Sequence, residues 1–281
     1  MINRYLKHLI QADFNKGKAL ILYGPRQVGK TTLVKSFLSE RSAYYNGDLD
    51  EVQAQFSRHN LTMLSALVAG KDTVVIDEAQ LIENIGLSLK ILIDHFPKTN
   101  FIVTGSSSLE LADTVNEPLT GRCFVHIMYP VAECELADGL NPVELNEGLE
   151  HRLIYGSYPE IITTQSLEDK QRLIEHIADN YLFKDVLKIE SIKNIALLER
   201  ILKALALQIG SEVSLNELAR IVDADKNTVK KYLDVCEKIF IVFSLPPFSN
   251  NKRKAIAKLK KYYFYDLGIR NALLRQFQPL Q

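Results

Sequence analysis

The spacing of apolar positions divides this chain of 281 residues into two parts. Short runs of apolar and aromatic residues, typical of buried strands, lie at 19–23, 42–46, 73–76, 100–104 and 123–128. Segments with an apolar residue at every third or fourth position separate several of these runs, as at 31–40 and 85–96, and this spacing predicts helices. Strands that alternate with helices favour an α/β fold with a parallel sheet. We predict such a core over residues 1–140.

The pattern becomes helical after the dipeptide Asn141-Pro142, which marks a boundary. Helical spacing continues to about residue 195, with one interruption at 155–160. The longest amphipathic segment in this part runs over 168–183. We predict that residues 141–195 form a helical lid.

The last part of the chain, 196–281, combines short helices with strands. Helices are predicted at 197–207, 215–222 and 227–236, and strands at 239–245 and 262–265. Ser214 and Glu217 stand at the two positions of a capping box, which fixes the start of the second helix. The turn at 223–226 is short, so the second and third helices form a helix-turn-helix. Two strands around a loop then complete a predicted winged helix.

One segment at the end of the first strand carries the strongest chemical signal. It fits the phosphate-binding P-loop pattern and reads Gly24-Pro25-Arg26-Gln27-Val28-Gly29-Lys30-Thr31-Thr32. Gly24 and Gly29 permit the backbone turns that bring amide groups around a phosphate. Lys30 can reach the β- and γ-phosphates, and the hydroxyl of Thr31 can ligate Mg²⁺. The strand before the segment and the helix after it are the context that this function needs. We predict a nucleotide-binding site with Mg²⁺ as cofactor.

A second signal lies where the run 73–76 ends in Asp77 and Glu78. Ligands of open α/β sheets bind at the carboxyl ends of the strands, so Asp77 is predicted to hold Mg²⁺. Glu78 is predicted to polarise the water that attacks the γ-phosphate. The run 42–46 is expected to place an additional strand between the P-loop strand and the acidic strand. That arrangement favours hydrolysis over phosphoryl transfer to a small molecule.

Two further residues are candidates for the same site, each with a plainer alternative. Ser106 follows the strand 100–104, where its hydroxyl can sense or orient water, or can cap the helix expected near residue 109. Arg122 precedes the strand 123–128 and either neutralises charge in the transition state or forms a surface ion pair.

Composition sets the broad class of protein. Formal charges balance to zero, and three cysteines are too few and too scattered for a disulfide framework or a zinc site. The first residues lack the apolar centre of a signal peptide, and no apolar run approaches the length of a membrane helix. We therefore expect a cytoplasmic protein without a membrane partner.

The balanced charge hides an asymmetry. From residue 226 onward, twelve Lys and Arg oppose three Asp and Glu, so this part carries a charge of +9. The basic residues of the predicted winged helix and its loop are Lys226, Lys230, Lys231, Lys252, Arg253 and Lys254. These side chains can contact the phosphates of double-stranded DNA. The alternative is a winged helix that packs on a protein partner, with a solvated charged face.

The motifs together resemble a family of bacterial and archaeal AAA-like ATPases with a C-terminal winged-helix region of uncharacterised role. The resemblance rests on the P-loop and on the segments at 75–80, 104–108, 121–122, 158–160 and 261–268. It implies ATP as the nucleotide, hydrolysis with Mg²⁺, and relatedness to AAA+ and signalling-switch ATPases. Family members often continue into a nuclease-like domain that needs an Asp and a later Glu-x-Lys. No acidic residue follows Asp266, so we expect no nuclease site in this sequence.

Taken together, the sequence predicts a slow Mg²⁺-dependent ATPase with a P-loop core, a helical lid beside the nucleotide and a basic winged helix. Nucleotide state is expected to gate contact between the winged helix and DNA. The alternative is a nucleotide-dependent switch or scaffold whose winged helix binds a protein.

Overall fold

The computed structural model describes residues 2–105, 119–179, 192, 194–248 and 259–280. The chain forms two compact units, residues 1–129 and 130–281. The helical segments of the predicted lid and those of the predicted winged helix belong to the second unit. The proposed three-part division into 1–140, 141–195 and 196–281 stays a prediction.

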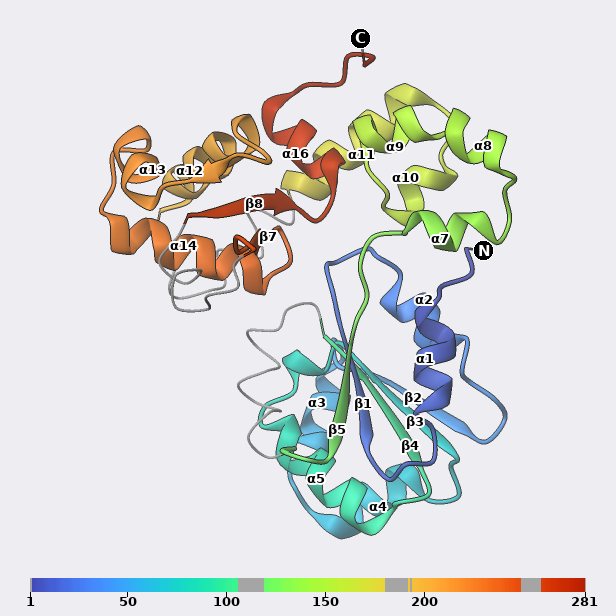
Figure 1. Ribbon diagram of the computed structural model, residues 1–281. Coiled ribbons are helices and arrows are strands. Elements are labelled where there is room, and N and C mark those ends of the chain that lie inside the picture. The colour runs from blue at the N-terminus through green and yellow to red at the C-terminus, as the bar shows by residue number, and fades with distance from the viewer. Residues whose placement is uncertain (1, 106–118, 180–191, 193, 249–258, 281) are drawn as a thin grey trace. The chain divides into compact units, whose positions relative to one another are not determined.

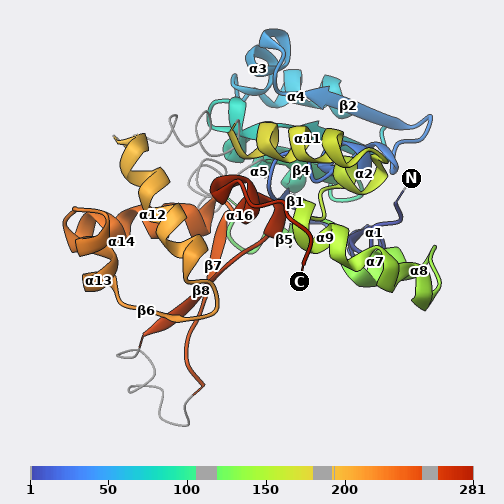
Figure 2. The same cartoon turned by 90° about the horizontal axis from the view of Figure 1, so that it is seen from above.

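The first unit is an α/β domain, as the spacing predicts. Its elements are α1 (Leu6–Ala12), β1 (Ala19–Tyr23), α2 (Lys30–Lys35), β2 (Ser42–Asn46), α3 (Asp50–Phe56), α4 (Leu61–Val68), β3 (Thr73–Asp77), the 3₁₀ turn η1 (Ala79–Leu81), α5 (Ile85–His95), β4 (Asn100–Thr104) and β5 (Cys123–Ile127). Five parallel strands form one sheet in the order β2-β3-β4-β1-β5. Helices α1 and α2 lie on one face of the sheet and α5 on the other (Figures 1 and 2). Helix α4 packs against α5.

The three central strands form the core of this unit. Every residue of β1, β3 and β4 is buried, which explains why these strands are apolar along nearly their whole length. The outer strands β2 and β5 are only partly buried. Burial on both faces fixes the central strands, and all three end at the same edge of the sheet because they run parallel.

The structure corrects one expectation about strand order. Strand 42–46 was expected between the P-loop strand and the acidic strand, but β2 lies at the outer edge and pairs with β3. The strand between β1 and β3 is β4. The connection after β1 skips the positions of β4 and β3 and leads to β2. The chain then adds β3 next to β2 and, after α5, adds β4 between β3 and β1. A strand does separate the P-loop from the acidic pair, but it is the one that ends at Thr104.

The second unit begins with five helices and ends with a mixed segment. The helices are α7 (Glu133–Ala137), α8 (Pro142–Glu147), α9 (Leu149–Tyr155), α10 (Pro159–Thr163) and α11 (Leu167–Asp179). The mixed segment contains α12 (Ile195–Leu207), β6 (Glu212–Val213), α13 (Leu215–Ile221), α14 (Lys226–Lys238), β7 (Val242–Leu245), β8 (Lys260–Phe264) and α16 (Leu267–Leu274). None of the helices in the described ranges has the length and apolarity required to cross a membrane.

The mixed segment contains the three predicted helices and the two predicted strands, together with β6 and α16, which were not predicted. Helices α13 and α14 form the helix-turn-helix, and Ser214 caps the first through the Glu217 amide. Strands β6, β8 and β7 form an antiparallel sheet in that order, with β7 and β8 side by side (Figure 2). The wing loop with Lys252, Arg253 and Lys254 lies outside the described residues. The assignment as a winged helix stays a prediction.

Helix α16, which was not among the predicted elements, joins the two parts of this unit. It contacts α9, α11 and α12. The carboxylate of Asp266 caps α16 through the Ile269 amide and also accepts from the Ser157 amide at 2.7 Å. The amide of Asn271 donates to the carbonyl oxygen of Ile154 at 2.8 Å. Gly156 has a φ of +88°, and a Cβ there would lie 2.1 Å from the Asp266 carboxylate, so the close approach requires glycine.

Candidate nucleotide site

The P-loop joins the end of β1 to the start of α2 and departs from ordinary backbone geometry at several positions. Gly29 has a φ of +94° and Gln27 a φ of +60°. Gly24 has a φ of +151°, and a Cβ there would lie 2.1 Å from the carbonyl oxygen of Met128. The glycine therefore lets the loop pass close to the chain that leaves β5. The backbone is held in the bent path that a phosphate-binding loop needs.

The side chain of Lys30 lies inside this loop. Only 5% of the residue is exposed, and its ammonium group donates to the carbonyl oxygens of Gly24 at 2.8 Å and Pro25 at 2.7 Å. These two bonds hold a positive charge at the centre of the loop. An anionic phosphate group placed there would meet both the charge and the loop amides.

Asp77, at the end of β3, is the most constrained acidic residue of the site. The residue is 2% exposed, and its carboxylate accepts hydrogen bonds from three hydroxyl groups. Thr31 donates to Oδ2 at 2.8 Å, Tyr44 donates to the same oxygen at 2.6 Å, and Thr104 donates to Oδ1. Each hydroxyl comes from a different element: α2, β2 and β4. The predicted pair of Thr31 and Asp77 is therefore brought together across 46 positions of sequence.

Tyr44 and Thr104 were not among the site residues predicted from the sequence. Burial, followed by the hydrogen bond to Asp77, raises the pKa of the Tyr44 phenol above its ordinary range, so the hydroxyl stays a donor. Thr104 is fully buried and also accepts a bond from the Glu78 amide at 3.0 Å. The strand-tip hydroxyl expected at Ser106 has this counterpart two residues earlier, and Ser106 itself lies outside the described residues.

Glu78 follows Asp77 in a strained conformation. Its φ of +50° is uncommon for a residue with a side chain, and such strain concentrates at functional sites. Gln80 donates to its Oε2 at 2.5 Å. The residue is only partly buried, so its carboxylate adjoins the buried Asp77 but remains accessible to water. The buried carboxylate of Asp77 fits the predicted role of a Mg²⁺ ligand, and the accessible carboxylate of Glu78 fits the predicted contact with water.

Arg4, which was not among the predicted site residues, holds the P-loop from outside. The residue is 8% exposed, and its guanidinium donates to the Val28 carbonyl oxygen and to the Tyr129 carbonyl oxygen, both at 2.6 Å. Val28 belongs to the P-loop, and Tyr129 follows β5. The sequence gives no signal for this contact, because Arg4 precedes α1 and is distant along the chain from both Val28 and Tyr129.

The structure corrects the expectation for Arg122. This residue lies next to Cys123, which pairs with Ala19 at the start of β1. The P-loop follows the other end of β1, and parallel strands keep those two edges apart. Arg122 instead forms an exposed ion pair with Asp94, with Nε 2.8 Å from Oδ1, and this contact raises its pKa. It does not neutralise charge in the nucleotide site of its own chain.

The predicted basic residues of the second unit are partly described. Lys226, Lys230 and Lys231 are exposed on α14, and no carboxylate within the described ranges forms an ion pair with them. The opposite side of α14 is buried through Val229 and Leu233. These three lysines therefore form one accessible positive face.

Comparison with known families agrees with this architecture. Residues 16–137 match the family described as an AAA domain. The first unit is an AAA-like P-loop ATPase domain. Residues 146–280 match a family described as Domain of unknown function (DUF8612).

Individual relatives extend the comparison to most of the chain. An uncharacterized protein of Mycobacterium tuberculosis is 29% identical over 270 residues, which are 94% of this chain and 58% of the relative. An uncharacterized protein of Haemophilus influenzae is 24% identical over 298 residues, 96% of this chain and 73% of the relative. The chain thus spans less than two thirds of the length of its mycobacterial relative. A Walker-type ATPase of Pyrococcus abyssi shares the fold with a TM-score of 0.61, at 17% identity, over 98% of this chain and 96% of that one.

Proposed function

We propose that this chain binds ATP with Mg²⁺ and hydrolyses it in the first unit. The observation that carries the proposal is the hydrogen bond between Thr31 and Asp77 beside the buried Lys30. These three residues supply a hydroxyl, a carboxylate and an ammonium group at the same edge of the sheet. That is the set that P-loop enzymes use for Mg²⁺ and the β- and γ-phosphates.

The donors at Asp77 suit Mg²⁺. This ion takes oxygen ligands, and it uses one or two carboxylates together with water and phosphate oxygens. Thr31 and Asp77 would hold it, and when bound it would neutralise charge on the transferring phosphoryl group. Tyr44 and Thr104 would keep the carboxylate in one orientation. No cluster of three acidic, His or Cys ligands occurs among the described residues, in keeping with an ion held mostly by nucleotide and water.

The remaining residues of the site have separate tasks. The backbone N–H groups of the loop, which Pro25 lacks, and the ammonium of Lys30 bind phosphate oxygens, and Arg26, Gln27 and Thr32 complete the loop. Glu78 orients a water molecule and accepts a proton from it as that water attacks the γ-phosphorus. The water oxygen forms the new bond to phosphorus, the bond to the bridging oxygen breaks, and ADP departs with that oxygen.

A comparison of Lys30→Ala and Glu78→Gln tests this proposal. Lys30→Ala should lose ATP binding, because the charge at the centre of the loop is gone. Glu78→Gln should bind ATP as the natural protein does but hydrolyse it at least a hundredfold more slowly, since general-base catalysis contributes about 10²–10⁴. Undiminished turnover in Glu78→Gln would remove Glu78 from the mechanism, and undiminished binding in Lys30→Ala would reject the site.

A second candidate function concerns α14. Lys226, Lys230 and Lys231 form an accessible cationic face on the second helix of a helix-turn-helix, which is the element that enters the major groove of DNA. We infer that this face contacts the phosphates of double-stranded DNA and that the nucleotide state of the first unit gates the contact. The alternative is a protein partner that carries an acidic surface.

Salt dependence separates these partners. Replacement of the three lysines by Gln should weaken binding to duplex DNA and lower the slope of log K against log salt by about one per lysine. The matched control replaces Lys71, Lys90 and Lys98 in the first unit, which changes the net charge equally. Equal loss of DNA affinity in both variants would indicate that DNA is attracted by the net charge of the protein and not by α14. If the natural protein does not bind DNA even at low salt, the protein partner is the remaining candidate.

A further inference from the structure

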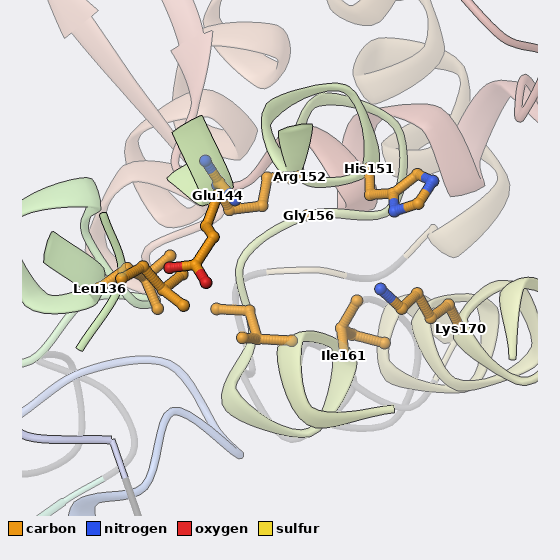
Figure 3. A pocket seen from close by; sticks show the side chains of 10 residues that line it. Leu136, Glu144, His151, Arg152, Gly156, Ile161 and Lys170 are labelled. Atoms are coloured by element: carbon orange, nitrogen blue, oxygen red, sulfur yellow. The ribbon is translucent and has the colours of Figure 1, made fainter. Parts of the chain in front are cut away.

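The helices at the start of the second unit enclose a pocket that the ATPase proposal does not use. Its volume is about 180 Å³, room for roughly six water molecules at liquid density. Figure 3 shows Lys170 and His151 at one end of the pocket, and Glu144 and Leu136 at the other. The other residues that line the pocket are Leu140, Gly148, Arg152, Gly156, Ile161 and Ile162. The pocket therefore has an apolar wall and charged ends.

Lys170 is the residue of this pocket that is best placed to bind an anion. Its side chain comes from α11 and is partly buried, and its ammonium group points into the pocket (Figure 3). No carboxylate in the described part of the chain forms an ion pair with it. Burial, and then the positive charge of Arg152, lower its pKa. An anion beside this ammonium group would offset both effects.

The other charged groups of the pocket already have partners. Arg152 binds both oxygens of Glu133, with Nε 2.6 Å from Oε1 and Nη2 2.9 Å from Oε2. The carboxylate of Glu144 accepts the Asn141 amide at 2.8 Å in the capping box of α8. Because Glu144 lies at the far end of the pocket, it does not neutralise Lys170. An anionic group would be attracted to the Lys170 end.

The guanidinium of Arg152 lies close to the backbone of Gly148 beside the pocket. A Cβ at Gly148 would lie 2.4 Å from Nη1 of Arg152, so a larger residue would push the guanidinium from its place. Ile161 is 1% exposed and Leu136 is 7% exposed, so the apolar wall is firmly packed. A ligand that fits must bring an aliphatic group to this wall and a negative charge to Lys170.

We propose that this pocket binds a small aliphatic carboxylate, with its carboxylate group on Lys170 and its hydrocarbon part against Leu136, Ile161 and Ile162. A free branched-chain acid and the last residue of a peptide that ends in leucine both carry this chemistry. The pocket is smaller than the clefts of about 300–1,000 Å³ that hold drug-sized ligands, so a small ligand suits it.

Calorimetric titration of the full chain without nucleotide tests the proposal. The probes are 4-methylpentanoate, its neutral amide, and a five-residue peptide that ends in leucine with either a free or an amidated terminus. The acid form should bind and the amide form should bind at least tenfold more weakly, because only the acid pairs with an ammonium group. If the free acid and the peptide with a free terminus both bind saturably, the pocket accepts the carboxylate from either source. If only that peptide binds, the ligand is the terminus of a chain.

Two variants on α11 complete the experiment. Lys170→Met keeps the length and apolar stem of the side chain but removes the charge, and it should weaken binding of the acid at least tenfold. Arg172→Met is the control on the same helix, because its side chain is 70% exposed and pairs with Glu168 outside the pocket. Equal binding of acid and amide, unchanged affinity in Lys170→Met, or absence of saturable binding at tens of millimolar would each overturn the proposal.

Discussion

The guanidinium group of Arg4 donates a 2.6 Å hydrogen bond to the carbonyl oxygen of Val28 in the P-loop. A second bond, also 2.6 Å, reaches Tyr129 at the end of the first unit. A single buried cation therefore ties the loop to the chain that leaves the sheet. Hydrogen bonds to charged groups contribute about 1.5–3 kcal/mol each, so this tie restrains the loop substantially.

Arg4→Ala should destabilise the first unit and weaken ATP binding by about tenfold, because the loop must then be ordered at the expense of binding energy. Nucleotide titration and urea unfolding measure the two effects. Arg41→Ala is the control, since Arg41 forms an exposed pair with Asp72 away from the loop. If ATP affinity stays unchanged while stability falls, Arg4 supports the fold and does not position the loop.

Tyr44→Phe should raise the Mg²⁺ concentration needed for half-maximal hydrolysis by about tenfold, the effect typical of a lost partner of a metal ligand. The reason is that Asp77 loses one of its three hydroxyl donors. Tyr45→Phe provides a matched control in the same strand, because its hydroxyl donates to the Leu67 carbonyl oxygen at 2.7 Å. Equal Mg²⁺ requirements in the two variants would refute a positioning role for Tyr44.

Arg122→Ala should leave the rate of ATP hydrolysis within about twofold of the natural rate, because a transition-state arginine would instead contribute about 10³–10⁵. Arg122 lies at the opposite edge of the sheet and pairs with Asp94. Steady-state turnover measured over a range of protein concentrations checks this expectation. A loss of several orders of magnitude that depends on protein concentration would instead place Arg122 in the site of a neighbouring copy.

The stability of the second unit should depend on pH through Asp266. Burial raises the pKa of this carboxyl group from 3.8 to about 6. Because the folded-state value is raised, the contribution to stability is complete below pH 3.8 and is lost as pH rises through 6. The natural protein should therefore lose about 1 kcal/mol relative to Asp266→Asn between pH 5 and pH 7. Urea unfolding at several pH values measures this difference, and a constant difference would contradict the assignment.

Local signals were sufficient to predict the sheet and the phosphate loop. Strands β1, β2 and β4 have the predicted limits, because each contains a short apolar or aromatic run between turns. The P-loop follows β1, Asp77 is the last residue of β3, and Glu78 comes directly after it. These inferences need only the neighbouring sequence.

Contacts between distant segments could not be predicted in this way. Thr104 and Tyr44 contact Asp77 because β3 lies between β2 and β4, and the sequence does not state the order of strands. The position of Arg122 follows from the direction of β5 in the parallel sheet, which the local sequence pattern does not reveal. Helix α16 did have a signal, since Asp266 is a good cap for the apolar positions Leu267 and Ile269, but the helix is short.

The cap at Asp266 has a consequence for how the second unit is made. The carboxylate contacts the Ser157 amide across 109 positions, and Asn271 contacts Ile154 across 117. During synthesis, helices α9 and α11 leave the ribosome long before the helix that packs on them. Until residues 266–274 emerge, the surface around Tyr155 and Gly156 has no cover, and a nascent chain in that state is exposed to aggregation and chaperone binding. Completion of this unit is therefore a late event that closes a long loop.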